Sequence, residues 1–86
     1  MVTWDKITEE KFKQILENIP LFMRAIAQEK ITNKVNALVN ADGRDIVNEK
    51  DMVDAFFCET PFGFHGPMKS DLKAVNIDYT QYGYDK

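Results

Sequence analysis

The chain has 86 residues, of which 44% are hydrophobic and 29% are charged. This composition is typical of a globular protein and too apolar for a disordered one, and the length allows a single domain over residues 1–86. The net charge is −3, and the chain has no dense cluster of basic residues. Nucleic-acid binding is therefore disfavoured, because a phosphate backbone requires a basic surface.

Compartment and membrane association can also be judged from the sequence. Cys58 is the only cysteine, so no internal disulfide can form, which suits a reducing environment. The first residues contain no apolar signal segment, and no apolar run reaches the roughly 18 residues of a membrane span. We therefore expect a cytoplasmic protein without a membrane segment.

The N-terminal third predicts an extended lead-in over residues 1–7 and a helix over residues 8–18. Trp4 is the only tryptophan, and at the edge of a small domain it is expected to pack on the core. Thr8 is placed as the N-cap of the helix, with Ile7 and Phe12 at hydrophobic-staple positions. The inward face contains Phe12, Ile15, Leu16 and Ile19.

A long central helix is predicted over residues 20–40, and the rest of the domain is expected to pack around it. Pro20 suits the first helical position, and Gly43 suits a left-handed C-terminal stop. The expected buried face follows the helical period and contains Phe22, Ile26, Ile31, Val35, Leu38 and Val39.

The C-terminal half predicts a short extended link at residues 45–47 and then a helix over residues 48–59. Asn48 is the predicted N-cap, and Asp51 stands where a capping box places its acidic residue. Two prolines and two glycines predict a loop over 60–67, with its phenylalanines lying over the helices, and a short helix over 67–75 follows. Residues 76–86 predict an extended aromatic arm.

These elements together predict an all-α domain of three to four helices. The region from Ala37 to Ala55 is also similar to the helix–strand–helix half of a histone fold, and packing alone could produce the same pattern. A histone-like DNA-binding protein is therefore one alternative function.

Part of the sequence resembles a known family. Trp4, Ile19-Pro20 with Phe22 and Arg24, Gly43-Arg44 and the Asn48–Ala55 segment resemble a small helical domain found at the C-terminus of one component of light-independent protochlorophyllide reductase, which also occurs as a stand-alone bacterial protein. The resemblance covers about residues 4–57. It implies a helical accessory domain without the iron–sulfur chemistry of that enzyme.

The C-terminal third resembles an uncharacterised family of small bacterial proteins. The residues that carry this likeness are the Thr60-Pro61 turn and the run Ile77-Asp78-Tyr79-Thr80-Gln81-Tyr82. This resemblance implies no activity, cofactor or partner.

One pair of residues could support catalysis. Cys58 and His65 are seven positions apart, and an imidazole near a thiol can generate a thiolate nucleophile. A buried free thiol and an unrelated loop histidine explain the same pair more simply. A metal site formed by Cys58, Glu59, His65 and Asp71 would fall short of zinc-ligand spacing, so no metal and no cofactor are predicted.

Two sets of basic residues have both a structural and a functional interpretation. Arg24 could bind a carboxylate of a partner, although an internal ion pair with Asp51 or Asp54 is the preferred prediction. Lys30 and Lys34 stand one helical turn apart and could contact an acidic surface. Two lysines are far fewer than a phosphate-binding surface requires.

Aromatic side chains are the remaining candidates for an interface or a ligand site. Three uses are open to them: completing the core, forming a protein interface, or lining a pocket for a flat ligand such as a tetrapyrrole. We predict a non-catalytic accessory or protein-interaction module that self-associates or binds a protein, with a tetrapyrrole-binding module as the alternative. The aromatic candidates are Phe62, Phe64, Tyr79, Tyr82 and Tyr84.

Overall fold

The computed structural model describes residues 2–86, and helices dominate it, which confirms the all-α prediction. Two strands of two residues each and two 3₁₀ turns accompany the helices. In chain order the elements are β1 (Thr3–Trp4), α1 (Lys6–Glu17), α2 (Leu21–Ala41), β2 (Ile46–Val47), α3 (Glu49–Glu59), η1 (Phe62–Phe64), α4 (His65–Ala74) and η2 (Tyr79–Tyr82).

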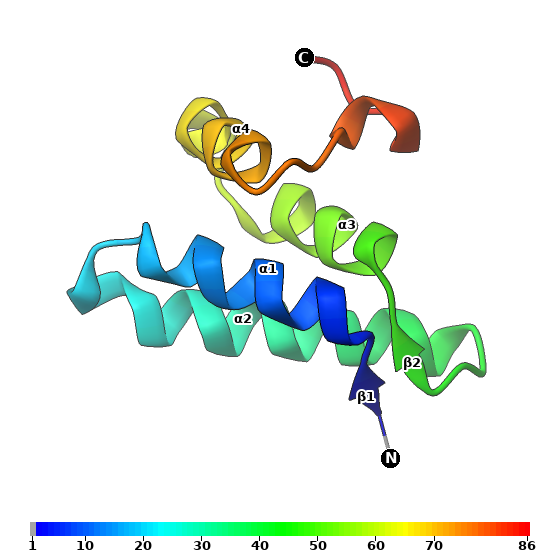
Figure 1. The fold of residues 1–86 in the computed structure, drawn as a ribbon. Coiled ribbons are helices and arrows are strands. Elements are labelled where there is room, and N and C mark those ends of the chain that lie inside the picture. The colour runs from blue at the N-terminus through cyan, green and yellow to red at the C-terminus, as the bar shows by residue number, and fades with distance from the viewer. Residues whose placement is uncertain (1) are drawn as a thin grey trace.

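The helices form successive levels around α3 (Figure 1). The helices α1 and α2 run antiparallel and side by side, joined by a short link at residues 18–20. The third helix lies across them, and α4 and the C-terminal segment cover the opposite side of α3. The central position of α3 explains why Met52, Val53 and Ala55 are fully buried.

The first helix begins earlier than predicted. Asp5 is its N-cap, and the Asp5 carboxylate accepts bonds from the Thr8 amide at 3.1 Å and the Thr8 hydroxyl at 3.0 Å. The prediction of Thr8 as N-cap was therefore wrong, because the Asp5 carboxylate is the group that accepts a free amide of the first turn. Ile7 is 64% exposed and forms no staple. Trp4 does pack on the core, stacked on Phe12 with ring centroids 4.9 Å apart.

The central helix is confirmed, but its predicted buried face is only half correct. Ile31, Val35 and Val39 are buried, whereas Phe22 is 81% exposed and Ile26 is 58% exposed. In Figure 1 α3 lies over the C-terminal half of α2 and does not reach its N-terminal end, where the exposed side chains lie. The N-terminal half of α2 is therefore positioned to line a surface site.

The link between α2 and α3 matches the prediction. Gly43 adopts a left-handed conformation with φ of 67°, and β2 pairs in parallel with β1, Trp4 opposite Val47. Asn48 and Asp51 form a reciprocal capping box at the start of α3. Helix, strand and helix thus follow one another in the order that the sequence suggested.

The segment after residue 60 is more regular than predicted. The expected loop over 60–67 contains η1 and the first turn of α4, which begins at His65 rather than at residue 67. Pro67 is accommodated there because the first turn of a helix does not use its backbone N–H groups. The arm is not extended either: it folds into η2, and Tyr79 is buried.

Candidate functional site

An apolar groove lies between the N-terminal half of α2, the C-terminal end of α3 and the start of α4. Its volume is about 520 Å³. One wall comes from α1 and α2, and the other comes from the end of α3, η1 and α4. The main apolar side chains that line it are Ile15, Ile19, Pro20, Met23, Ile26, Ile31, Phe56, Pro61, Phe64, Pro67 and Met68.

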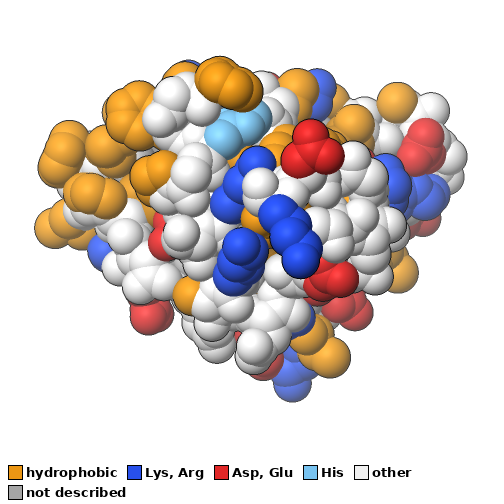
Figure 2. All heavy atoms as spheres, turned by 90° about the horizontal axis from the view of Figure 1, so that it is seen from above, with side chains coloured by type: hydrophobic (Ala, Val, Ile, Leu, Met, Phe, Trp, Pro, Cys, Tyr) orange, Lys and Arg blue, Asp and Glu red, His pale blue; other side chains and the backbone are white. Residues whose placement is uncertain are grey.

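Large apolar side chains are exposed in and beside this groove. Among the lining residues, Met23 is 45%, Ile26 58% and Phe64 60% exposed. At the α1–α2 corner, Leu21 is 77% and Phe22 is 81% exposed. Figure 2 shows hydrophobic side chains crowded at the end of the molecule that carries this corner. Such clustering at one end is typical of an interaction surface, whereas single exposed apolar residues are ordinary.

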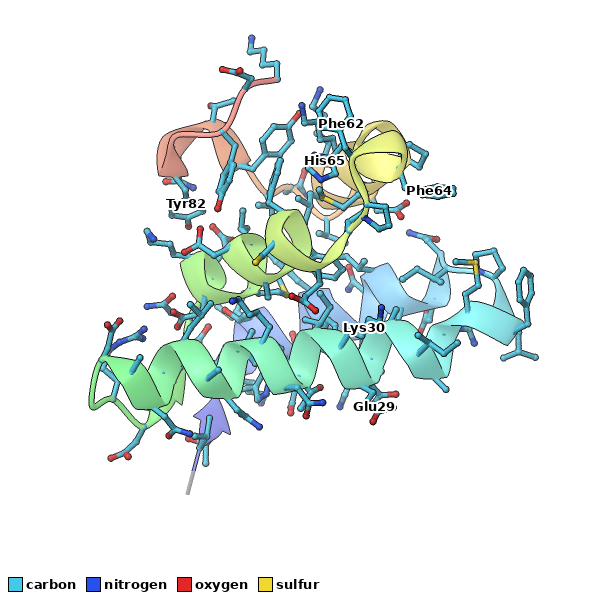
Figure 3. The ribbon with its side chains drawn as sticks, turned by 180° about the vertical axis from the view of Figure 1, so that it is seen from behind. Glu29, Lys30, Phe62, Phe64, His65 and Tyr82 are labelled. Atoms are coloured by element: carbon cyan, nitrogen blue, oxygen red, sulfur yellow. The ribbon has the colours of Figure 1, made fainter. Side chains whose placement is uncertain are left out.

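Three charged side chains stand on the walls of the groove. Lys30 is on the α2 wall, and Glu59 and Asp71 are on the opposite wall. None of them forms an ion pair within residues 2–86. Figure 3 shows that Lys30 points toward α3 and α4, whereas the neighbouring Glu29 points away from them. Burial raises the pKa of the Asp71 carboxyl above its usual value.

The two phenylalanines of η1 point to different surfaces. Phe64 lines the groove, and Phe62 does not, although Phe62 is 88% exposed. Figure 3 shows the two rings on opposite sides of the start of α4. The prediction that both rings lie over the helices is therefore wrong, and only Phe64 belongs to the candidate site.

Arg24 has a structural role that differs from the predicted ion pair. Its guanidinium donates to the carbonyl oxygens of Leu16 at 2.7 Å, Glu17 at 3.2 Å and Ile19 at 3.1 Å. These carbonyls belong to the end of α1 and the following link, where intrahelical donors are missing. The predicted partners are occupied by other cations: Arg44 pairs with Asp51, and Lys50 pairs with Asp54.

Among the ion pairs of residues 2–86, Arg44–Asp51 has the most deeply buried acid. Asp51 is buried, and Arg44 donates to its two carboxylate oxygens at 2.9 and 2.7 Å. Burial by itself would raise the pKa of Asp51, but the bonds from Arg44 and from the Asn48 amide outweigh it and lower the pKa. The bonds to Asp51 and Asp42 in turn raise the pKa of Arg44.

Cys58 and His65 are not joined by a hydrogen bond within residues 2–86. Cys58 is exposed, whereas His65 Nε2 lies 2.9 Å from the Thr60 carbonyl oxygen and its ring packs on Phe57 and Phe62. In the same residues no group of three or more metal-ligating side chains comes together. The geometry thus offers neither the nucleophile–base contact nor the ligand set considered above.

The tyrosines of the C-terminal segment turn inward onto α3. The Tyr82 hydroxyl donates to Glu49 at 2.5 Å, and the Tyr84 hydroxyl donates to Asp54 at 2.6 Å. Burial and the hydrogen bond to Asp54 raise the pKa of Tyr84 to about 12. Burial and the hydrogen bond to Glu49 raise the pKa of Tyr82 even more. Tyr84 also stacks on Phe57 with centroids 3.9 Å apart. These contacts use the tyrosines to attach the segment to the core.

Tyr79 lies at a second, shallower hollow of about 400 Å³. Residues 76–80, Lys73 and Lys86 line this hollow. The Tyr79 ring is buried, and its hydroxyl has no hydrogen-bond partner within residues 2–86. The amines of Lys69 and Lys73 lie 6.0 and 5.8 Å from the ring centroid.

Several groove residues were not identified from the sequence as part of an interface. Met23, Glu59, Pro67 and Asp71 were assigned to helices, a loop or a metal site, and Ile26 was assigned to the core. A signal was nevertheless present, because Leu21, Phe22, Met23 and Ile26 fall within six residues and point in several directions around a helix. A helix covered on one side cannot bury all of them.

In residues 2–86 no helix combines the length and apolar character needed to cross a bilayer.

Comparison with known proteins places the chain in one family and adds no activity. No curated protein and no solved structure matches the sequence. A family model does match, over residues 1–84, and its description is "Protein of unknown function (DUF2621)". The chain therefore belongs to this family.

Proposed function

We propose that the domain is a non-catalytic protein-interaction module whose groove binds an apolar segment of a protein chain. The observation that carries the proposal is the groove of about 520 Å³ together with the exposed apolar side chains at its mouth. Phe22, Ile26 and Phe64 are largely exposed to water, and burying them against a partner would be favourable. Such a surface is best explained by a partner that covers it.

The arrangement of the surface favours a protein partner. An apolar centre with a polar rim is the usual anatomy of a protein interface, and aromatic anchors supply much of its binding energy. Here the apolar side chains of Phe64 and Ile26 line the groove together with the charged side chains of Lys30, Glu59 and Asp71. An amphipathic helix fits a groove of this kind, because its apolar residues at i, i+3 and i+4 form one stripe.

The likeness to the reductase domain is compatible with this proposal and contributes little to it. An accessory helical domain acts through contacts with other chains, and so does the module proposed here. The iron–sulfur chemistry of the reductase does not enter the proposal. A cytoplasmic location likewise stays a prediction.

A small apolar ligand, such as a tetrapyrrole, is the second candidate function. The groove volume lies within the roughly 300–1,000 Å³ of small-molecule sites. Leu21 and Phe22, however, lie outside the lining of the groove and are the more exposed side chains. A small ligand inside the groove would leave them in water, so a partner with a larger contact surface is preferred.

A titration with a model peptide tests the proposed function. The probe is a synthetic amphipathic helix of about 18 leucine and lysine residues, long enough for its apolar stripe to span several turns. It is added to ¹⁵N-labelled protein and followed by NMR. We expect chemical-shift changes confined to the groove and the adjoining corner of Leu21 and Phe22, with Phe64→Ser weakening binding about ten-fold or more. The matched control Phe62→Ser removes an equally large exposed ring outside the groove and should bind like the parent.

Two results would count against a protein-binding groove. The first is an absence of shift changes at millimolar peptide when the protein is monomeric. The second is an equal loss of binding in Phe62→Ser and Phe64→Ser, which would indicate non-specific attraction to exposed rings. A parallel titration with hemin, followed by absorption spectroscopy, distinguishes the second candidate. Micromolar hemin binding that Phe64→Ser abolishes, without peptide binding, would support the ligand site instead.

A further inference from the structure

We propose that the partner is a second copy of this chain, and that two copies bury their α1–α2 corners in each other's grooves. This inference rests on the proposed function, since it names the occupant of the same groove. Three observations support it: the shape of the surface, the apolar area that it exposes, and the position of its charges.

The first observation is that one end of the molecule carries both a projection and a hollow. Leu21 and Phe22 are exposed at the corner, and their chain neighbours Pro20 and Met23 line the groove. A two-fold dimer requires a self-complementary surface, because each contact between two different residues occurs twice. A corner and an adjoining groove meet this requirement.

The second observation is the exposed apolar area. Five side chains contribute to it, with exposed fractions between 45% and 81%. If a large apolar side chain can bury about 150 Å² or more, these five expose on the order of 500 Å² per copy. Two copies would thus bury about the 1,000 Å² that a specific interface needs, before the polar rim is added. The five are Leu21, Phe22, Met23, Ile26 and Phe64.

The third observation is the distribution of charge on the two walls. The α2 wall carries the cation Lys30, the opposite wall carries the anions Glu59 and Asp71, and among residues 2–86 none of the three forms an ion pair. In a two-fold arrangement whose axis runs along the groove, the α2 wall of one copy faces the opposite wall of the other. Lys30 of each copy then meets the acids of the other copy, so the same ion pairs form twice.

Sedimentation equilibrium over roughly 5 to 500 µM protein tests the dimer, because this range brackets the micromolar affinity of a small interface. We expect a monomer–dimer equilibrium that Phe22→Ser and Phe64→Ser each weaken about ten-fold or more, because each substitution removes two anchors per dimer. Phe62→Ser is the matched control and should leave the dissociation constant unchanged. Circular dichroism verifies the fold, which these exposed positions should not disturb.

A charge exchange provides a second, independent readout. Lys30→Glu should weaken the dimer, and combining it with Glu59→Lys should recover at least part of the loss. Glu29→Lys changes a neighbouring charge that points away from the groove, so it should have no effect. Recovery in the double variant is difficult to explain by any general effect of net charge.

The outcomes separate this inference from the proposed function. A chain that stays monomeric at the highest concentration and still binds the model peptide overturns the dimer and leaves the interaction module intact. A dimer that Phe22→Ser, Phe64→Ser and Lys30→Glu do not weaken forms through another surface and also overturns the inference. A monomer that does not bind the peptide overturns both proposals.

Discussion

The Nε atom of Arg24 donates a hydrogen bond to the carbonyl oxygen of Leu16 at 2.7 Å. The bond joins the first turn of α2 to the last turn of α1, and two further bonds from the same guanidinium reach Glu17 and Ile19. The corner that projects Leu21 and Phe22 is therefore held by one side chain. Removing it should loosen the surface on which both proposals depend.

Arg24→Met should lower the free energy of unfolding by about 2 kcal/mol, because carbonyls at the end of α1 lose a charged donor. Arg24→Lys should recover only part of this, since one ammonium cannot reproduce the planar fork. Urea unfolding measures both. Lys13→Met is the control, because the pair of Lys13 with Glu9 is exposed and 3.9 Å long. Equal stability of Arg24→Met and Lys13→Met would contradict the assigned role.

Asp51→Ala should be among the most destabilising polar substitutions, costing about 2–3 kcal/mol of unfolding free energy. It removes the buried partner of Arg44 and also half of the capping box at the start of α3. Asp42→Ala removes the exposed partner of the same arginine and should cost below about 0.5 kcal/mol. A similar cost for both substitutions in urea unfolding would show that burial of the pair matters little.

The same carboxylate should make stability depend on acid pH. The folded-state pKa of Asp51 is lowered, so its contribution is present above the unfolded value of about 4 and is lost as the pH falls through the folded value. Urea midpoints measured from neutral to strongly acid pH should therefore fall below about pH 4. Asp51→Asn should flatten this fall, and an unchanged profile would exclude Asp51 as its source.

Alkaline pH should release the C-terminal segment. The folded-state pKa values of Tyr82 and Tyr84 are raised above the unfolded value of about 10, so their contribution is present below that pH and is lost as the pH rises further. Ultraviolet titration should show a tyrosine that ionises with a pKa of about 12, and Tyr84→Phe should remove it. Ionisation of Tyr82 and Tyr84 with the pKa of about 10 of unperturbed phenols would contradict the contacts with Glu49 and Asp54.

Gly43→Ala should lower the free energy of unfolding by about 1 kcal/mol, although the added methyl group would meet no atom of residues 2–86 within 4 Å. The cost arises from the backbone alone, because φ is 67°. Gly66→Ala is the control, and its expected effect on stability has the opposite sign. Gly66 lies in α4 with equally open surroundings, so alanine should stabilise by about 0.5 kcal/mol. Thermal or urea unfolding that ranks the two variants in reverse would be inconsistent with the structure.

Local chemistry made most of the helices predictable from the sequence. The capping box of Asn48 and Asp51, the glycine at position 43 and the proline at position 20 each act within a few residues of themselves, so the bounds of α2 and α3 were foreseen to within a residue. The start of α1 was missed because Asp5 and Thr8 are both good caps, and only the geometry shows which one accepts the free amides.

Tertiary packing decided which apolar residues are buried. A helical period identifies a face, but it does not show how much of that face a neighbouring helix covers. Because α3 lies over the C-terminal half of α2, Val35 and Val39 are inside while Phe22 and Ile26 are not. Arg24 likewise bonds to carbonyls of α1 that no residue pattern reveals. The helices thus follow from local sequence, whereas the groove and its exposed rings follow only from how the helices pack.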